Sequence, residues 1–147
     1  MISFTELYEK RADYIYFLCT RLEQNLESAE ALFGEVWKLV QTKMPQLRGK
    51  SEEKWLCACL VESHRQYRKK FISEQNFPPP RSSVEYLILF AINQLSLEQR
   101  WPFVLKECAG FNYRELSEIL KIPEAAVRTR ISQARARIQS VQKRETP

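Results

Sequence analysis

Apolar residues recur three or four positions apart through most of this chain, which is the spacing of a single helix face. Residues that favour helix starts and stops divide this pattern into segments. Ser3 with Glu6 predicts the start of the first helix, and Ser28 predicts the start of the second. The expected helices cover about residues 4–24, 29–42, 51–72, 84–93 and 96–109, with a loop at 44–50.

The stretch 111–138 predicts two more helices joined by a tight turn. Asn112 and Glu115 have the spacing of a capping box at the start of the first. Pro123 ends that helix and opens the next, because its fixed φ suits a first helical turn. Lys121 lies in the turn and must either take a left-handed conformation or alter the turn.

The second helix of this pair has two faces of different character. Val127, Ile131, Ala134 and Ile138 form an apolar stripe. The opposite face carries small and polar residues, and arginines flank it on both sides. A helix in a DNA major groove needs this arrangement, with small polar side chains at the base edges and cations at both phosphate walls. The groove-facing residues are Ala125, Thr129, Ser132, Gln133 and Ala136, and the flanking residues are Arg128, Arg130, Arg135 and Arg137.

A solvated amphipathic helix is the alternative interpretation, since basic runs are often only surface. However, residues 125–144 contain six Arg or Lys and no acid. A helix that is merely solvated usually mixes charges for pairing along its face. The pattern therefore favours nucleic-acid binding.

The amino-acid composition indicates the fold class and the cellular compartment of the protein. Three glycines and abundant helix formers favour an all-α protein of two small domains, and the net charge of +5 suits an acidic partner. The four cysteines show no C-x-x-C pair, no signal peptide is expected from the sequence, and no apolar run approaches a membrane span. Buried thiols in a reducing cytoplasm are the expected state. A metal site at Cys57, Cys59 and His64 is disfavoured, because residues two apart on a helix point to different faces.

The end of the third expected helix combines cations with aromatic rings. Single-stranded DNA binding uses this combination, with charge along the backbone and rings against the bases. A basic helix end favoured by the macrodipole, with the rings in the core, is an equally weighted alternative. His64 is expected at the surface or on a phosphate. The residues are His64, Arg65, Tyr67, Arg68, Lys69 and Lys70, followed by Phe71.

Residues 73–83, SEQNFPPPRSS, predict a linker. Three consecutive prolines favour an extended form that reaches about 30 Å. The expected organisation is a first domain at 1–72, a linker at 73–83 and a helix-turn-helix domain at 84–147.

The stretch LSLEQRWPFVLKECAGFNYRELSEILKIPEAAVRTRISQARARI resembles the −35-reading domain of bacterial sigma-70 family factors, closest to the extracytoplasmic-function group. The resemblance rests on the Leu-x-x-x-Gln-Arg opening at 95–100, the aromatic entry at 111–113 and the Arg-x-Arg ending at 135–137. Lys121 stands where the family usually has glycine. The first half, with FTELYEK, SAEALFGEVW and RGKSEEKWL, resembles the family's domain for polymerase binding and −10 opening.

The departures from the family fall in this first half. The family presents an Asp and a Gln to the polymerase clamp where this chain has Ala31 and Gly34, and of these polar positions Glu35 alone matches. Glu62 replaces an Asn that lies where the melted strand is gripped. Gly34 is expected to allow close packing.

The resemblance implies a sigma factor that binds core RNA polymerase and promoter DNA and is held by an anti-sigma factor, with no catalytic residue, cofactor or metal. Two alternatives are a sigma-like decoy that acts on an anti-sigma factor and a plain helix-turn-helix repressor. The resemblance implies −35 groove contacts at Arg128, Thr129, Ser132 and Gln133, and phosphate contacts at Tyr113, Arg114, Arg130, Arg135 and Arg137. The implied −10 contacts are His64, Arg65, Tyr67, Arg68, Lys69 and Lys70. The implied polymerase contacts are Ala31, Gly34 and Glu35.

Overall fold

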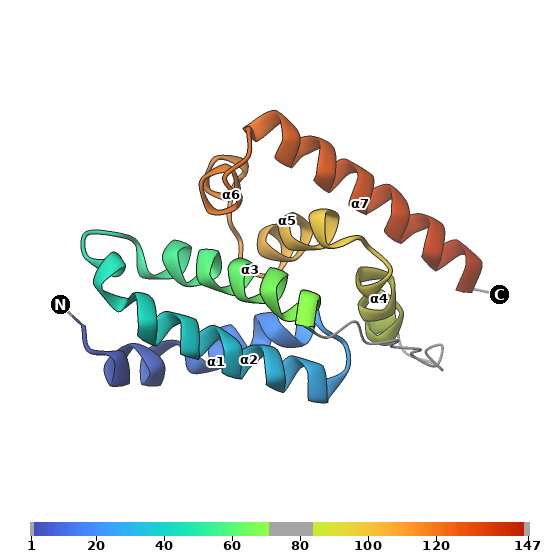
Figure 1. The fold of residues 1–147 in the computed structure, drawn as a ribbon. Helices are drawn as coiled ribbons and strands as arrows, with labels where there is room; N and C mark the ends of the chain where they lie inside the picture. The colour runs from blue at the N-terminus through green and yellow to red at the C-terminus, as the bar shows by residue number, and fades with distance from the viewer. Residues whose placement is uncertain (1, 71–83, 146–147) are drawn as a thin grey trace.

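The computed structural model describes residues 2–70 and 84–145, and the expected linker lies outside them. Within these residues the regular structure is helical, as the pattern predicted, with no strand (Figure 1). The elements are α1 (Phe4–Leu22), α2 (Leu26–Lys43), the 3₁₀ turn η1 (Met44–Leu47), α3 (Glu52–Lys70), α4 (Val84–Asn93), α5 (Leu97–Glu107), α6 (Tyr113–Leu120) and α7 (Glu124–Glu145).

Caps set the starts of the first two helices. The Ser3 side chain accepts a hydrogen bond from the Glu6 backbone N–H at 3.1 Å, which confirms the predicted start of α1. The predicted cap of α2 is wrong. Asn25, and not Ser28, is the N-cap, and its Oδ1 accepts from the Ser28 N–H at 3.2 Å. The helix therefore begins three residues earlier, and Ser28 is buried in its first turn.

The first three helices pack together around apolar side chains. Leu7, Leu32 and Leu56 come from α1, α2 and α3 in turn, and each is fully buried. The packing role expected for Gly34 is wrong, because Gly34 is exposed and a Cβ built there meets nothing within 4 Å. Its place in the middle of α2 brings no close contact with any residue that the structure describes.

The second half has the predicted helix-turn-helix. Asn112 Oδ1 accepts from the Glu115 N–H at 2.8 Å and Glu115 Oε1 accepts from the Asn112 N–H at 3.1 Å, so the capping box is complete. Lys121 takes the left-handed conformation at φ 58° and ψ 45° and ends α6. Gly110, at φ 80°, follows the end of α5 in a left-handed conformation. Pro102 lies inside α5 without delaying its start, which is at Leu97.

The two halves pack directly on each other. Helix α1 contacts α4 and α5, and α3 contacts α6, so the second half covers one side of the first (Figure 1). Helix α7 lies on the far side of α5, away from α1 and α2. In the described ranges, no helix is both long and apolar enough to cross a bilayer.

Candidate nucleic-acid interface

Helix α7 buries one face and exposes the other. Val127, Ile131 and Ala134 are fully buried against the helices of the second half. Thr129, Ser132 and Gln133 on the opposite side are exposed, as are Ala125 and Ala136. The face that the sequence pattern assigned to the major groove is therefore open to solvent in the packed molecule.

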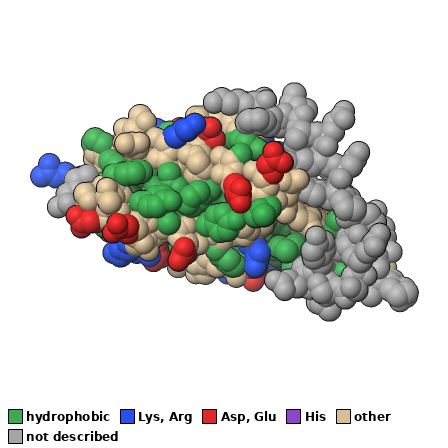
Figure 2. Space-filling model, turned by 90° about the horizontal axis from the view of Figure 1, so that it is seen from below, with side chains coloured by type: hydrophobic (Ala, Val, Ile, Leu, Met, Phe, Trp, Pro, Cys, Tyr) green, Lys and Arg blue, Asp and Glu red, His purple; other side chains and the backbone are tan. Residues whose placement is uncertain are grey.

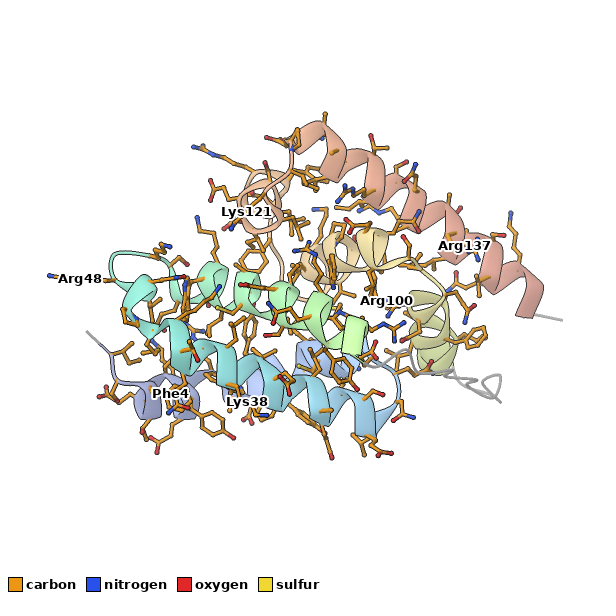
Figure 3. The ribbon with its side chains drawn as sticks, viewed as in Figure 1. Phe4, Lys38, Arg48, Arg100, Lys121 and Arg137 are labelled. Atoms are coloured by element: carbon orange, nitrogen blue, oxygen red, sulfur yellow. The ribbon has the colours of Figure 1, made fainter. Side chains whose placement is uncertain are left out.

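The arginines beside this face are exposed or half-buried, and several pair with acids. Arg130 Nη1 lies 2.9 Å from Glu98 Oε2, and Arg135 Nη2 lies 2.9 Å from Glu107 Oε1, both on α5. Pairs near the surface contribute less than about 1 kcal/mol, so a phosphate can compete for these guanidiniums. Arg137 points outward from α7, and no carboxylate lies within ion-pair distance of it in the described part of the chain (Figure 3).

The start of α6 adds a second group of cations around an aromatic ring. The guanidinium of Arg128 lies 4.2 Å from the centre of the Tyr113 ring, and the Lys106 ammonium lies 4.7 Å from it. Arg114 is exposed and lies 3.8 Å from Glu118. Tyr113 thus packs against two cations, and the Arg114 side chain is 84% exposed beside Glu118.

The basic end of α3 differs from its prediction. The expectation that His64 lies at the surface is wrong, since its side chain is fully buried. Tyr67 is 6% exposed and belongs to the core, which was the alternative interpretation. Arg65 is exposed and its guanidinium lies 4.9 Å from the centre of the Trp101 ring, while Arg68 is half-buried. The side chains of Lys69 and Lys70 lie outside the described residues.

A buried polar cluster explains why His64 is inside. Glu23, at the end of α1, accepts from His64 Nε2 at 3.2 Å, from Arg100 Nη1 at 3.3 Å and from Arg68 Nη1 at 3.4 Å. Trp101 Nε1 donates to His64 Nδ1 at 2.8 Å. We call Glu23, His64, Arg68, Arg100 and Trp101 the interdomain cluster, because α5 contributes two of its members and the first half contributes three.

Arg100 lies between the two halves (Figure 3) and joins the cluster through Glu23. It donates to the backbone oxygens of Asn93 and Leu95 at 3.0 and 2.8 Å, which fixes the turn between α4 and α5. It also donates to the Leu22 oxygen at 3.0 Å across the interface. The arginine of the Leu-x-x-x-Gln-Arg motif is thus a structural residue in this chain, with one role inside its own half and one between the halves.

The charges of the cluster follow from its geometry. Burial alone raises the pKa of Glu23, but the hydrogen bond from His64 and the charges of Arg68 and Arg100 outweigh it, so this pKa lies below its usual value. Burial lowers the pKa of His64, and Glu23 reverses that effect only in part. Burial also lowers the pKa of Arg100 to about 10, which leaves it charged at neutral pH. The cluster therefore contains an ionised Glu23 and a neutral His64.

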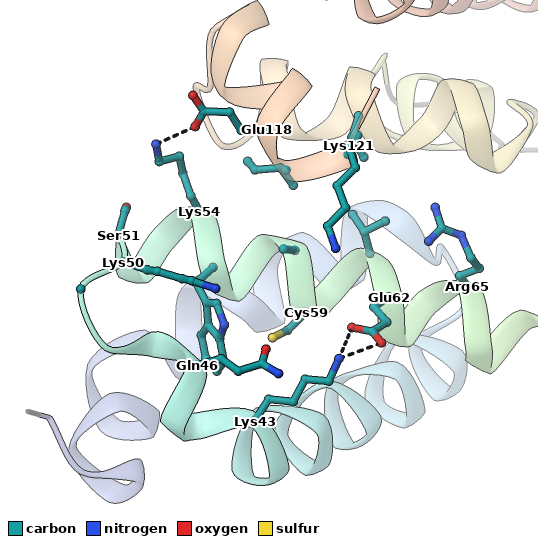
Figure 4. A pocket seen from close by; sticks show the side chains of 16 residues that line it. Lys43, Gln46, Lys50, Ser51, Lys54, Cys59, Glu62, Arg65, Glu118 and Lys121 are labelled. Carbon is teal, nitrogen blue, oxygen red and sulfur yellow. Dashed lines mark hydrogen bonds and ion pairs between the residues drawn. The ribbon is translucent and has the colours of Figure 1, made fainter. Parts of the chain in front are cut away.

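A cleft of about 620 Å³ lies between the loop before α3 and the turn after α6 (Figure 4). Two of its lysines are paired, Lys43 with Glu62 at 2.8 Å and Lys54 with Glu118 at 2.9 Å. The side chain of Lys121 points into the cleft from the second half. Together with Lys50 and Arg65 it makes the cleft basic. These lysines were not among the predicted site residues, because the two halves that bring them together are far apart in sequence.

The face of α1 and α2 is apolar at the surface (Figure 2). Tyr8 and Phe17 on α1 are 38% and 40% exposed, and Tyr8 packs edge-on against Trp37 with ring centres 5.0 Å apart. Ala31 and Gly34, two of the expected polymerase contacts, are exposed on α2, whereas Glu35 is half-buried and pairs with Lys38. We call this surface the α1–α2 face.

The four cysteine side chains are buried or half-buried and form no disulfide. Cys19, Cys57 and Cys59 are buried, as expected, and Cys108 is half-buried. Burial raises the pKa of Cys57 and of Cys59 to about 12, so both remain thiols. No group of three His, Cys, Asp or Glu side chains in the described ranges could hold a metal ion.

Comparison with known proteins agrees with this geometry. Residues 86–138 match the family described as "Sigma-70, region 4". The fold resembles that of the sigma factor RpoE in its co-crystal structure with the anti-sigma factor NepR from Bartonella quintana, with a TM-score of 0.76 and 23% identity over 95% of this chain and 96% of that one. No curated protein matches the sequence. Residues 86–138 therefore match a sigma-70 region 4, and nearly the whole length of the chain has the fold of that solved sigma factor.

Proposed function

We propose that this protein binds core RNA polymerase and directs it to specific promoters for the initiation of transcription. The observation that carries the proposal is the exposed polar face of α7, with arginines along both sides, inside a matched region 4. Its task is recognition, and the proposal assigns it no catalytic step. The proposed location is the cytoplasm, where polymerase and promoter DNA are found.

The −35 contacts follow from the exposed positions on α7. Gln133 is the proposed base reader, because an amide can bond adenine through two atoms at once, and Thr129 and Ser132 lie beside it. Arg137 and the paired Arg130 and Arg135 are proposed to hold phosphates. Because phosphate contacts position the helix and base contacts specify the sequence, the two groups have separable effects.

The −10 contacts are proposed at the exposed cations of the first half. Arg65 remains a candidate because its guanidinium is exposed, and the basic cleft adds Lys50 beside the start of α3. Cations that track a backbone are what single-stranded DNA requires. His64 and Tyr67 are excluded from this set while the two halves are packed, since both are buried.

Protein partners are proposed on two grounds. The α1–α2 face exposes aromatic side chains next to Ala31 and Gly34, and exposed apolar patches of this kind mark protein interfaces. We assign this face to core polymerase. The structural neighbour is bound to an anti-sigma factor, and we propose an anti-sigma partner for this chain too.

A run-off transcription assay with core polymerase and a genomic fragment library tests the function. The expected result is defined transcripts that share a −35 sequence. Gln133→Ala should change which promoters are used. Gln94→Ala is the matched control, because Gln94 is exposed between α4 and α5 and belongs to none of the proposed contacts. Absence of any transcript that depends on the added protein would contradict the proposal.

A sigma-like decoy is the second candidate, favoured by the lack of polar side chains at Ala31 and Gly34. Such a protein would bind an anti-sigma factor and leave core polymerase unbound. Direct binding of the labelled chain to core polymerase separates the two functions, since only the sigma factor should bind it.

A further inference from the structure

The imidazole of His64 is held between the two halves in a way that permits one protonation state. Trp101 Nε1 lies 2.8 Å from His64 Nδ1, and an indole nitrogen can only donate. His64 Nδ1 must therefore be the acceptor and carry no hydrogen. Nε2 then carries the hydrogen and donates to Glu23 Oε2 at 3.2 Å. The ring is neutral and is bonded on both sides.

Protonation would place a hydrogen on Nδ1, directly opposite the Trp101 N–H. The hydrogen bond across the interface would be lost and two donors would face each other, in a site where His64 has no exposed surface. Because a buried donor without a partner is strongly unfavourable, the α3–α5 contact would have to separate or shift.

The other charged groups near His64 do not relieve this conflict. Glu23 is already bonded by Arg68 from α3 and by Arg100 from α5. Arg65 lies on the Trp101 ring, and the thiol of Cys19, whose pKa is raised by burial and by Glu23, stays neutral. One carboxylate therefore faces two guanidiniums, and a protonated His64 would add a third cation without adding an acid.

We propose that His64 is a pH-sensitive latch between the two halves of the protein. The neutral ring joins α3 to Trp101 of α5 and to Glu23 of α1, and a proton on Nδ1 releases α5 from α3. Release uncovers the end of α3 and separates the two DNA-reading regions. Only the consequence for promoter binding rests on the proposed function, because the latch itself is a property of the free protein.

The pH window follows from the lowered pKa of His64 in the packed state. In the separated state the imidazole is in water and its pKa returns to about 6.5. The packed state is therefore most favoured above about pH 6.5. As the pH falls from there toward the lower pKa of the packed imidazole, the ratio of packed to separated molecules decreases by at most about tenfold per pH unit. Glu23, whose pKa is lowered, changes packing only below about pH 4.3, the ordinary pKa of a glutamate, and Arg100 stays charged throughout.

NMR of the imidazole tests the first step, and His64 is the one histidine of the sequence, so assignment is immediate. At pH 7.5 we expect the neutral tautomer with hydrogen on Nε2 and a hydrogen-bonded Trp101 indole proton. Small-angle X-ray scattering from pH 7.5 to 5 should show the radius of gyration rising as this imidazole protonates. Far-UV circular dichroism over the same range should stay constant, which separates opening from unfolding.

Two variants decide the cause. His64→Gln supplies a neutral donor and acceptor that cannot be protonated, so its dimensions should not change between pH 7.5 and 5, whether it is packed or open. Trp101→Phe removes the donor opposite Nδ1, so the imidazole should protonate at a higher pH. The radius of gyration of this variant should then rise less between pH 7.5 and 5 than that of the native protein. The proposal is overturned if Nδ1 carries a hydrogen at pH 7.5, or if His64 protonates while the radius of gyration stays constant. It is also overturned if the radius of gyration of His64→Gln rises between pH 7.5 and 5 as it does in the native protein. None of these measurements involves polymerase, so they stand apart from the transcription assay.

Discussion

Replacing Lys121 with glycine should stabilise the protein. Lys121 holds φ at 58° and ψ at 45°, a left-handed conformation that costs a residue with a Cβ roughly 1–2 kcal/mol. Glycine adopts it without that cost but gives the unfolded chain more freedom, which offsets about 0.5–1 kcal/mol. The side chain of Lys121 is exposed and makes no ion pair in the described part of the chain, so little is lost with it. The net gain should be about 1 kcal/mol, or about 2–4 °C in Tm for a chain of this size.

Thermal and urea unfolding of Lys121→Gly and Lys121→Ala measure this gain. Alanine removes the same amine from the basic cleft but retains the strained backbone, so it should unfold close to the native protein. The difference between the two variants isolates the conformational contribution from the loss of charge. Equal stability of Lys121→Gly and Lys121→Ala, or a less stable Lys121→Gly, would refute the reasoning, because it would mean that the turn stores no strain.

Three further outcomes are expected. Gln133→Ala should weaken binding to the preferred −35 duplex by about 1–3 kcal/mol and to duplexes changed at one base pair by much less, measured by fluorescence anisotropy; an equal loss on all duplexes would mean that Gln133 does not read a base. Arg137→Ala should flatten the slope of log K against log salt concentration by about one unit. Arg130→Ala and Arg135→Ala should flatten this slope by the same amount or less, because Glu98 and Glu107 already pair with the guanidiniums of Arg130 and Arg135. An unchanged slope would exclude a phosphate contact at the substituted arginine. Ala31→Asp should strengthen binding to core polymerase in a pull-down titration if the α1–α2 face meets the clamp, while an unchanged affinity would place the contact elsewhere.

The helices and the open face of α7 were predictable because their signals are local. Val127, Ile131 and Ala134 repeat at the helical period, and the residues opposite them are exposed as that period requires. The start of α2 was placed three residues late because Asn25 and Ser28 are both good caps. The sequence does not decide between them, whereas the hydrogen bond from Ser28 N–H to Asn25 does.

His64 was misplaced although a local signal existed. It stands four residues after Leu60 and three before Tyr67, both buried, so helical spacing places it on the inward face of α3. The charged neighbours on that stretch outweighed the spacing. Its partners gave no local signal at all, because Glu23 is 41 residues earlier and Trp101 is 37 residues later. Contacts between the halves depend on packing that local periodicity does not specify.

The two proposed DNA-reading regions are in different states in the packed molecule, and α5 is the reason. One side of α5 supports α7 and pairs with Arg130 and Arg135 through Glu98 and Glu107, so the proposed −35 face is formed and exposed. The other side places Arg100 and Trp101 against the end of α3, so part of the proposed −10 region is covered. Because one rigid helix serves both contacts, separating α5 from α3 uncovers the −10 region without disturbing the helix-turn-helix. The proposed −35 face is thus available in the packed molecule, whereas full access to the proposed −10 region requires that α5 leave α3.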